Sequence, residues 1–472
     1  MTPFTVRIRA SALSLDLSPF QFKAGDWEIG RALFAPLLRF APDFTLQPHL
    51  LAAWALADDG RAATFRLRPD LVFHNGRQVV AADLAFSLER GRSPGARASF
   101  RQLLAEVVRI EVLDPLTVRV ALRRPNRMFP VYFTRAALSL VPPEELQPDD
   151  LWRWRDLPVG CGPYRVEGRD TGSLRLVQHA PFFGLTPHSP GRLVFVLDQA
   201  PEACDLVLDE EILAEPDFAF VPSSFWSAVA VEHYSFAGQD EDRARAVRHL
   251  VNTAISVPQL LAVLPANSQA YYQPAASFVP PAIGGEAVSP AGRGAFSAAL
   301  AAYEQAWGTL PRLVNVIYRG YGPESGLGKL QKALGRQLRG LGLPVEDLAT
   351  YSLALDQTEP VMAFVLAASS FNYPDYDNLS LYFARGGDIH RASTPGLESL
   401  RALLDRGRET FDGCHQKRIY GEVQALLLDE GWIHPVAHLP EYAFARTTKI
   451  AASSIFTKGP HHFFEDLRTA ET

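Results

Sequence analysis

Cysteine is scarce in this chain of 472 residues. The three cysteines, Cys161, Cys204 and Cys414, are an odd number and no two are closely spaced. At most one intrachain disulfide can therefore form, and a disulfide framework is excluded. We expect free, buried thiols, because an isolated cysteine packs as a small hydrophobe.

Long apolar runs and basic tracts are also lacking. The longest uninterrupted apolar run, Leu50 to Ala57, is far shorter than the roughly 20 residues that a membrane-spanning helix needs. The formal net charge is −6, and Lys and Arg are interspersed with Asp and Glu. A nucleic-acid partner is not expected, because a phosphate backbone is bound by clustered basic side chains.

Motifs for catalysis and metal binding are missing as well. The chain contains no H-E-x-x-H, no G-x-S-x-G and no phosphate-binding loop ending in G-K-[ST]. His434 and His438 are spaced for chelation on a helix, but Pro435 favours an extended segment instead. We therefore expect no enzymatic activity, no metal site and no cofactor.

What the chain does contain is typical of a soluble protein with at least two domains. Apolar residues make up 47% and charged residues 21% of the chain, which is enough to bury ample core. The most informative segment runs from Thr64 to Arg90, TFRLRPDLVFHNGRQVVAADLAFSLER. Its apolar alternation predicts a strand, and Asn75-Gly76 predicts a turn with positive φ. Val79 to Leu88 is predicted to form a helix, with Asp83 near the positive N-terminal end of the helix dipole.

A second local pattern predicts a β-hairpin. Val107 to Leu122 reads VVRIEVLDPLTVRVAL. Ile110 and Val112 alternate with polar residues before Asp114-Pro115, and Val118 and Val120 do so after it.

The order of these segments resembles the extracytoplasmic solute-binding proteins of family 5, the peptide/nickel class of ABC importer receptors. The Thr64 to Arg90 segment is similar to the signature of that family. The segment from Pro158 to Tyr164 (PVGCGPY) is similar to the G-[TS]-G-P-[YF] turn of the family, with Cys161 in place of Thr or Ser. Further resemblances cover almost the whole chain: Trp27 to Phe40, Gln47 to Gly60, Val247 to Ile255, Phe278 to Pro281, Leu334 to Val345, Phe371 to Phe383 and Arg418 to Pro435.

The resemblance implies an α/β fold of the two-lobed periplasmic-binding-protein type II kind, with an extra inserted subdomain and a ligand cleft between lobes. Lobe one is expected to comprise residues 1–32, 158–238 and 442–472. The inserted subdomain is expected at 33–157 and lobe two at 239–441. Closure over a ligand would be a hinge motion.

The departures from the family pattern bear on the ligand. Peptide-binding members use an acidic residue to pair with the α-ammonium of the ligand, and Asn372 takes that position here. Arg97 aligns with a position that is commonly aromatic, and Arg101 lies one helical turn further on. These changes favour a ligand with carboxylate or phosphate, although both arginines also suit a solvated surface.

Other candidate contacts come from the same resemblance. Ser11, Ala12 and Leu13 lie at a strand edge where peptide-binding members offer backbone groups to an extended ligand. Aromatic pocket residues would be Phe371, Tyr373, Tyr376 and Trp27, for which simple packing is an equal alternative. Asp377 suits turn capping, while both a capping and a ligand role remain open for Asp375.

The predicted function is a solute-binding receptor for an ABC importer. It would capture a small polar ligand, either an anionic sugar or amino-acid conjugate or a short peptide, and deliver it to permease subunits in the membrane. We expect a monomer that is periplasmic or extracellular. Residues 1–9 show no export signal, so a cytosolic ligand-sensing module related to transcription regulators is the alternative.

Overall fold

The computed structural model describes residues 3–8, 24–96, 101, 103–151, 153–197, 199–208, 216–234, 240–280, 296–317, 325–348, 361–371, 397–456 and 463–470. The chain divides into two compact units. Unit one contains Met1–Asp209, Leu213–Ser224 and Tyr442–Thr472, and unit two contains Glu210–Ile212 and Phe225–Glu441. Two strands, β12 (Phe218–Tyr234) and β17 (Ile433–Arg446), begin in one unit and end in the other. The finer predicted division into lobes and insert stays a prediction.

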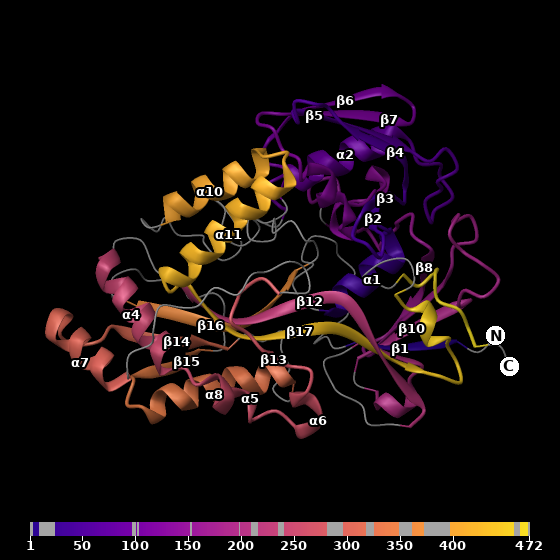
Figure 1. The fold of residues 1–472 in the computed structure, drawn as a ribbon. Helices are drawn as coiled ribbons and strands as arrows, with labels where there is room; N and C mark the ends of the chain where they lie inside the picture. The colour runs from indigo at the N-terminus through magenta and orange to yellow at the C-terminus, as the bar shows by residue number, and fades with distance from the viewer. Residues whose placement is uncertain are drawn as a thin grey trace. The chain divides into compact units, whose positions relative to one another are not determined.

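Unit one is rich in strands (Figure 1). Its strands are β1 (Phe4–Ile8), β2 (Leu38–Phe40), β3 (Leu46–Pro48), β4 (Leu51–Leu56), β5 (Ala62–Leu67), β6 (Val107–Asp114), β7 (Thr117–Leu122), β8 (Tyr164–Arg169), β9 (Ser173–Gln178), β10 (Arg192–Val196) and β11 (Leu206–Leu208). Its helices are α1 (Ala24–Phe34) and α2 (Ala81–Arg92), with 3-10 helices η1 (Phe129–Thr134), η2 (Ala136–Leu138), η3 (Pro143–Glu145), η4 (Pro201–Ala203) and η6 (Ala452–Ser454).

The strands of unit one form three sets. β1 runs parallel to both β10 and β11, and β10, β9 and β8 continue antiparallel to an edge. β2 and β3 form a small pair, and β4, β5, β7 and β6 form a separate antiparallel sheet in that order. The predicted hairpin is confirmed as β6 and β7, whose turn is closed by the Asp114 carboxylate accepting from the Leu116 amide at 2.8 Å.

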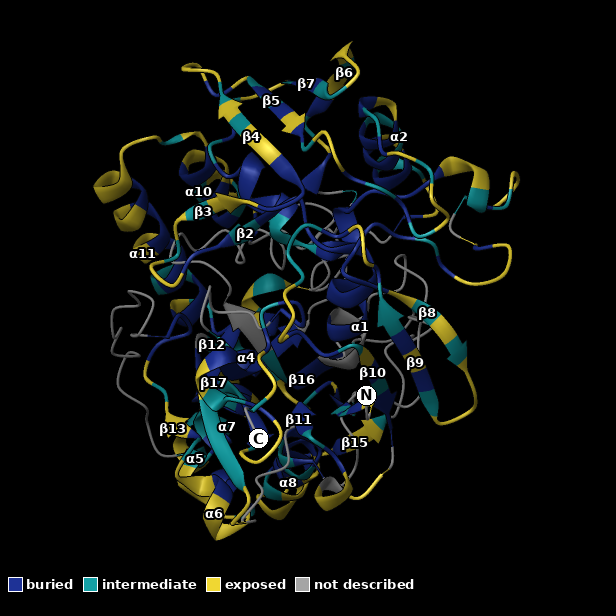
Figure 2. Cartoon of the chain, turned by 90° about the vertical axis from the view of Figure 1, so that its right-hand side faces the viewer, coloured by how far each residue is buried: buried dark blue, intermediate teal, exposed yellow. Residues whose placement is uncertain are grey.

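Period-two alternation explains the core of the four-stranded sheet. Every second residue of β5 and β7 is fully buried or nearly so, including Phe65 and Val120. Phe65 packs edge-on against Phe133 with ring centroids 4.7 Å apart, and α2 covers β6 and β7 (Figure 1). The sheet thus has one buried apolar face and one solvent-exposed face. Figure 2 shows the exposed part of β4.

The signature helix begins two residues later than its apolar pattern predicts, at Ala81. Gly76 has φ +89°, so the predicted positive-φ turn at Asn75-Gly76 is confirmed.

The end of α1 is held by an unusually close backbone contact. The Gly162 amide donates to the Leu33 carbonyl at 2.9 Å, and the Ser139 hydroxyl donates to the Phe34 carbonyl at 2.7 Å. A Cβ added at Gly162 would lie 2.6 Å from the Ala32 carbonyl oxygen, and one at Gly160 would overlap the Leu33 carbonyl. Both glycines are therefore required by space rather than by a left-handed φ.

The segment near the carboxyl end of the chain is docked onto unit one. Phe463 and Phe464 are buried, as is Glu465. The Glu465 carboxylate lies 3.1 Å from the Nε2 atom of buried His49, whose Nδ1 atom lies 3.1 Å from the Pro36 carbonyl. The hydrogen bond between Glu465 and His49 and the ring contact between His49 and Phe463 together fix this segment beside β3.

Unit two combines helices with strands, so the predicted α/β class is confirmed. Its helices are α4 (Glu241–Ala254), α5 (Val257–Leu261), α6 (Ala266–Gln269), α7 (Phe296–Trp307), α8 (Gly326–Gly340), α10 (Leu397–Glu409) and α11 (Gly413–Asp429). Its strands are β13 (Gln273–Pro274), β14 (Arg312–Val316), β15 (Val345–Leu348) and β16 (Val361–Phe371). β14 is parallel to β15 and β16, and β16 pairs antiparallel with β12.

The core of unit two includes a fully buried charge. The Arg248 side chain on α4 is 0% exposed and stacks over the Trp432 ring at 3.8 Å. Its guanidinium donates to the Glu241 carboxylate at 2.8 Å and to the Glu430 carbonyl at 2.9 Å. A buried guanidinium is tolerated only with such partners.

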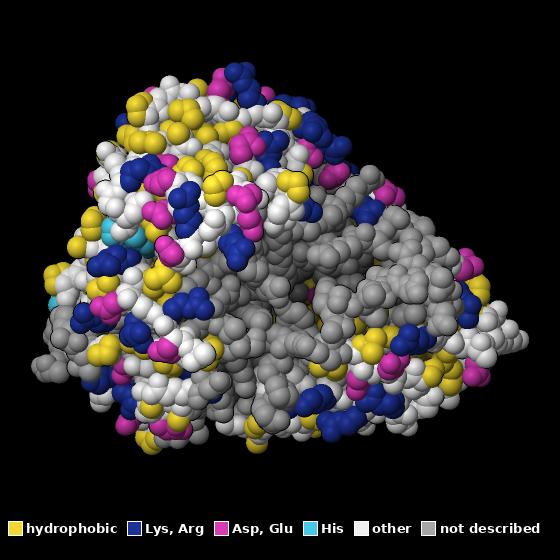
Figure 3. Space-filling view, turned by 180° about the vertical axis from the view of Figure 1, so that it is seen from behind, with side chains coloured by type: hydrophobic (Ala, Val, Ile, Leu, Met, Phe, Trp, Pro, Cys, Tyr) yellow, Lys and Arg dark blue, Asp and Glu magenta, His cyan; other side chains and the backbone are white. Residues whose placement is uncertain are grey.

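The surface carries both signs of charge. Figure 3 shows Lys and Arg interspersed with Asp and Glu over the described part of the face that it draws. None of the described helices has the length and hydropathy needed to cross a bilayer.

Replacing Gly162 with alanine should destabilise the protein strongly. The added methyl group must displace the Leu33 backbone, so we expect a loss of about 2–3 kcal/mol in the free energy of unfolding, measured by urea denaturation. Gly172→Ala is the matched control, because its Cβ would meet no atom within 4 Å. Equal stability of the two variants would contradict the close contact.

Candidate functional site

Most of the predicted ligand contacts lie outside the described residues. These are Ser11, Ala12, Leu13, Arg97, Asn372, Tyr373, Asp375 and Tyr376. Trp27 is placed on α1 and Phe371 at the end of β16, in both cases as backbone positions only. Their roles as ligand contacts stay predictions.

The structure does describe the elements that flank these segments. β1 ends at Ile8, just before Ser11, and α1 begins at Ala24. In unit two, β16 ends at Phe371, directly before Asn372. A segment that follows directly on a paired strand has a fixed point of origin, which is how binding residues are commonly positioned.

Arg101 is the one predicted contact whose side chain is described. It is half-buried, and its Nη1 atom donates to the Pro94 carbonyl at 2.7 Å and to the Ala96 carbonyl at 3.0 Å. Ala96 directly precedes Arg97 in the chain, and Pro94 lies a little earlier in the same segment. The contacts of Arg101 therefore favour a role in holding the backbone that leads to Arg97.

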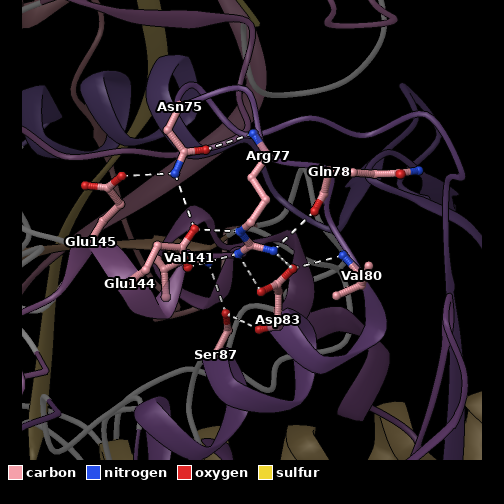
Figure 4. Close-up of polar contacts among 9 residues, drawn as sticks. All are labelled: Asn75, Arg77, Gln78, Val80, Asp83, Ser87, Val141, Glu144 and Glu145. Atoms are coloured by element: carbon pink, nitrogen blue, oxygen red, sulfur yellow. Dashed lines mark hydrogen bonds and ion pairs between the residues drawn. The ribbon is translucent and has the colours of Figure 1, made fainter.

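The signature turn is organised around the guanidinium of Arg77 (Figure 4). Arg77 contacts Asp83 through two hydrogen bonds of 3.0 and 2.8 Å, and its Nε atom donates to Glu144 at 2.5 Å. The Asn75 amide reaches Glu145 at 3.0 Å. The hydrogen bond to Asp83, followed by that to Glu144, raises the pKa of Arg77, so Arg77 keeps its positive charge at any ordinary pH.

Asp83 joins this cluster to the start of α2. Its carboxylate accepts from the Val80 backbone amide at 2.9 Å, which satisfies an amide that the helix leaves unpaired (Figure 4). One turn further on, the Ser87 hydroxyl donates to the Asp83 carbonyl at 2.7 Å and accepts from the Val141 amide at 3.1 Å. Asp83 is 5% exposed, so its charge depends on Arg77 for compensation.

His74, two residues before the turn glycine, fastens the signature to the Gly160-Cys161-Gly162 turn. Its backbone amide donates to the Gly160 carbonyl at 2.8 Å. Its Nδ1 atom accepts from the Gly160 amide at 3.2 Å, and its Nε2 atom lies 3.1 Å from the Gly162 carbonyl. One neutral tautomer, with the proton on Nε2, satisfies both ring contacts.

A second histidine packs against the first. The rings of His74 and His179 meet edge-on at 4.9 Å, and His179 Nε2 lies 2.9 Å from the Val72 carbonyl. Burial and the neighbouring His179 lower the pKa of His74 to about 3, and burial also lowers the pKa of His179. Both ring nitrogens of His74 are occupied by backbone groups, so this histidine has a structural role and no ring nitrogen left for proton transfer.

The sequence interpretation missed the roles of His74, Arg77 and Glu144. It placed Asp83 near the positive end of the helix but did not predict its ion pair. The sequence His74-Asn75-Gly76-Arg77 places Arg77 directly after a tight turn, and the side chain of Asp83, six residues later, is within reach of its guanidinium. That spacing is the sequence signal from which the Arg77–Asp83 ion pair could have been predicted. Glu144 is too distant in the chain for its ion pair with Arg77 to be predicted from sequence.

The remaining predictions concern cysteines and histidines. All three cysteines are free; Cys161 and Cys204 are buried as expected, whereas Cys414 is exposed, because it lies in the first turn of α11. Burial raises the pKa of the Cys161 thiol. His434 and His438 lie in strand β17, so the extended segment is confirmed. Within the described part of the chain, no group of three or more His, Cys, Asp or Glu is placed to hold a metal ion.

Comparison with known proteins finds a family model that matches the middle of the chain. Residues 45–226 match the model of bacterial extracellular solute-binding proteins, family 5 Middle. The glutathione-binding protein GsiB of Salmonella paratyphi A is 26% identical over 142 residues, which cover 29% of this chain and 27% of that protein. The chain is thus matched to only about a quarter of the length of this relative.

Solved structures resemble the whole chain. The dipeptide-binding protein of Pseudoalteromonas sp. SM9913, in complex with Met-Leu, is 16% identical with a TM-score of 0.81, covering 99% of this chain and 100% of that one. The binding protein AgaA from A. tumefaciens R10, in complex with agropinic acid, is 17% identical with a TM-score of 0.80, covering 100% and 99%. The predicted type II periplasmic-binding-protein fold is confirmed.

Removing the Asp83 carboxylate should destabilise the signature segment. In Asp83→Ala the Arg77 guanidinium loses its buried partner and the Val80 amide loses its acceptor, so we expect a loss of about 2–3 kcal/mol in the free energy of unfolding. Glu144→Gln is the control: Glu144 is 45% exposed, and its loss of charge should cost less than about 1 kcal/mol. Chemical denaturation of both variants checks the difference, and a larger cost for Glu144→Gln would refute the assignment.

Acid should destabilise the protein through His74. Its folded pKa is about 3 against an ordinary value of 6.5, so only the unfolded chain takes up this proton between those pH values. The stabilising contribution is therefore complete above pH 6.5 and is lost as the pH falls toward 3. Between pH 7 and pH 5 the wild type should lose about 2 kcal/mol more than His74→Asn, measured by urea denaturation at each pH. Parallel pH profiles for the two proteins would exclude His74 as the source.

Proposed function

From the confirmed likeness to the family 5 extracellular solute-binding proteins, we propose that this chain is the solute-binding receptor of an ABC importer. Family members are non-enzymatic components of transporters, and they are periplasmic or extracellular. The observation that carries the proposal is the match of residues 45–226 to the family model, together with a fold that follows solved binding proteins over the full chain. Permease subunits in the membrane would be the partners.

The ligand that we propose is a small anionic conjugate. Asn372 removes the acidic group that would pair with the ammonium of a peptide, and Arg97 adds a positive charge. A desolvated carboxylate or phosphate requires such a partner. Glutathione and agropinic acid, named for the relatives above, are both conjugates of amino acids that carry carboxylates, and this chemistry supports the proposal.

Arg101 has a supporting part in this proposal. Because it holds the Pro94 and Ala96 carbonyls, it fixes the start of the segment that carries Arg97. We assign it as a positioning residue, and direct ligand contact is assigned to Arg97 and Asn372. Phe371, Tyr373, Tyr376 and Trp27 remain candidates for apolar contact with the ligand.

The alternative function, a cytosolic ligand-sensing module, is not favoured by the relatives. GsiB and the two solved proteins above are named as binding proteins. No observation in the described residues supports a regulatory partner.

A thermal-shift screen of the purified chain tests the ligand class. Glutathione, agropinic acid, sugar phosphates, dipeptides and a Ni–histidine chelate would each be added, because a ligand that binds only the folded state raises the melting temperature. At about 100 times Kd the stabilisation is about 2.7 kcal/mol, equivalent to a shift of a few degrees. We expect anionic conjugates to raise the melting temperature and dipeptides with a single carboxylate to have little effect.

Variants test the proposed anionic ligand separately from the proposed receptor function. Arg97→Ala should abolish the shift, whereas Arg175→Ala, which removes an exposed arginine on β9, should leave it unchanged. Asn372→Asp should restore affinity for dipeptides. Stabilisation of the wild type by dipeptides alone would overturn the anionic ligand and retain the receptor function; no shift with any compound would count against both.

A further inference from the structure

Strand β6 exposes more large apolar side chains than any other element in the described part of the chain. Val108, Val112 and Leu113 are 51%, 48% and 53% exposed, and only three other large apolar residues reach comparable exposure there. Figure 2 shows β6 at the margin of the molecule. Isolated surface apolar residues are ordinary, but three on one eight-residue strand form a patch that needs a physical explanation.

β6 is also an edge strand. The four-stranded sheet has the order β4-β5-β7-β6, and among the described residues β6 pairs with β7 alone. The side of β6 that faces away from β7 therefore presents backbone amides and carbonyls without a strand partner. Proteins commonly protect such edges, because they pair readily with another strand.

The register separates β6 into an apolar row and a charged row. Ile110 and Val112 lie opposite Val120 and Val118, on the face that α2 covers. Arg109 and Glu111 lie on the opposite face and form an ion pair of 2.7 Å with each other. Because these two side chains are 69% and 38% exposed, the pair contributes little net energy and can exchange partners readily.

These two rows are complementary to themselves. If a second copy of β6 lies antiparallel with Ile110 opposite Ile110 of that copy, Arg109 faces Glu111 on both sides of the two-fold axis, within the regular run from Arg109 to Val112. Each arginine then lies opposite a carboxylate of the other copy, and the apolar Ile110 side chains meet at the axis. Directly opposite pairs of this kind stabilise adjacent strands, and like charges there are unfavourable.

We propose that the outer edge of β6 is a self-association surface, on which two copies of this chain pair antiparallel about a two-fold axis at Ile110. The two four-stranded sheets become one continuous sheet across the axis. An isologous contact of this kind closes on itself and gives a dimer rather than a fibre.

The association should be weak. The β6–β7 ladder shifts register between Val107 and Arg109 and again between Val112 and Asp114, which leaves a short regular run in between. Bulges bend and twist a strand and so limit the length that a partner strand can follow. A contact of a few residues buries less than the roughly 1,000 Å² of a stable interface, so the chain is expected to be monomeric when dilute and dimeric when concentrated.

Charge reversal tests the two-fold register. Sedimentation velocity from about 10 μM to about 1 mM should show a monomer–dimer equilibrium for the wild type. Arg109→Glu and Glu111→Arg should each reduce the association constant by roughly tenfold or more, because each places like charges opposite on both sides of the axis. An equimolar mixture of the two variants should recover association, since every cross-strand pair is then of opposite sign.

Arg312→Glu is the matched control, because it reverses one member of another exposed ion pair, in unit two, and should leave association unchanged. Melting temperatures of all variants show that they are folded. A wild type that stays monomeric at about 1 mM overturns the proposal, as does a dimer that is insensitive to both reversals or a mixture that fails to recover.

Cross-linking provides an independent measurement of the register. In a Cys414→Ser background, which removes the exposed native thiol, Ile110→Cys should form a disulfide-linked dimer on mild oxidation. Opposite Cα atoms in antiparallel strands lie about 4.5–5.5 Å apart, within the range that a disulfide spans. Glu111→Cys is the control and should not link to itself, because its opposite residue is Arg109; equal linking of both variants would overturn the register.

Discussion

The close approach of the Gly160-Cys161-Gly162 turn to the end of α1 is the constraint on which much of unit one depends. The Gly162 amide caps the Leu33 carbonyl, and no side chain fits between the two backbones. His74 then ties the signature segment to the same turn through its backbone and both ring nitrogens. Three parts of the chain that are far apart in sequence are thereby held together by a few hydrogen bonds to backbone groups.

Buried charged groups also join segments of the chain. Asp83 is compensated by Arg77, and Arg248 by Glu241 and the Trp432 ring. An unpaired ion at either of these positions would cost several kcal/mol. That is a large part of the roughly 5–15 kcal/mol by which a typical domain is stable against unfolding. These pairs therefore specify which segments meet, while the apolar strands supply most of the stabilisation.

The proposed ligand contacts need elements that hold their neighbouring segments still. In unit one, β1 ends shortly before Ser11 and α2 ends shortly before Arg97, and each of these elements is fixed by pairing or capping within the unit. The edge of β6 lies on a separate sheet, so self-association there leaves the pairing of these elements unchanged.

The sequence by itself determined the local elements. Alternation in β5, β6 and β7, the Asn75-Gly76 turn and the apolar face of α2 follow from steric and hydrophobic preferences of neighbouring residues, and each was predicted within a few positions. The family motifs likewise fixed the fold class. Only the tertiary structure decided that Glu144 pairs with Arg77, that His74 closes on Gly160, that Arg101 holds the backbone before Arg97, and that Cys414 is exposed. Those contacts join residues whose separation in space is set by the packing of whole elements, and no local preference encodes that distance.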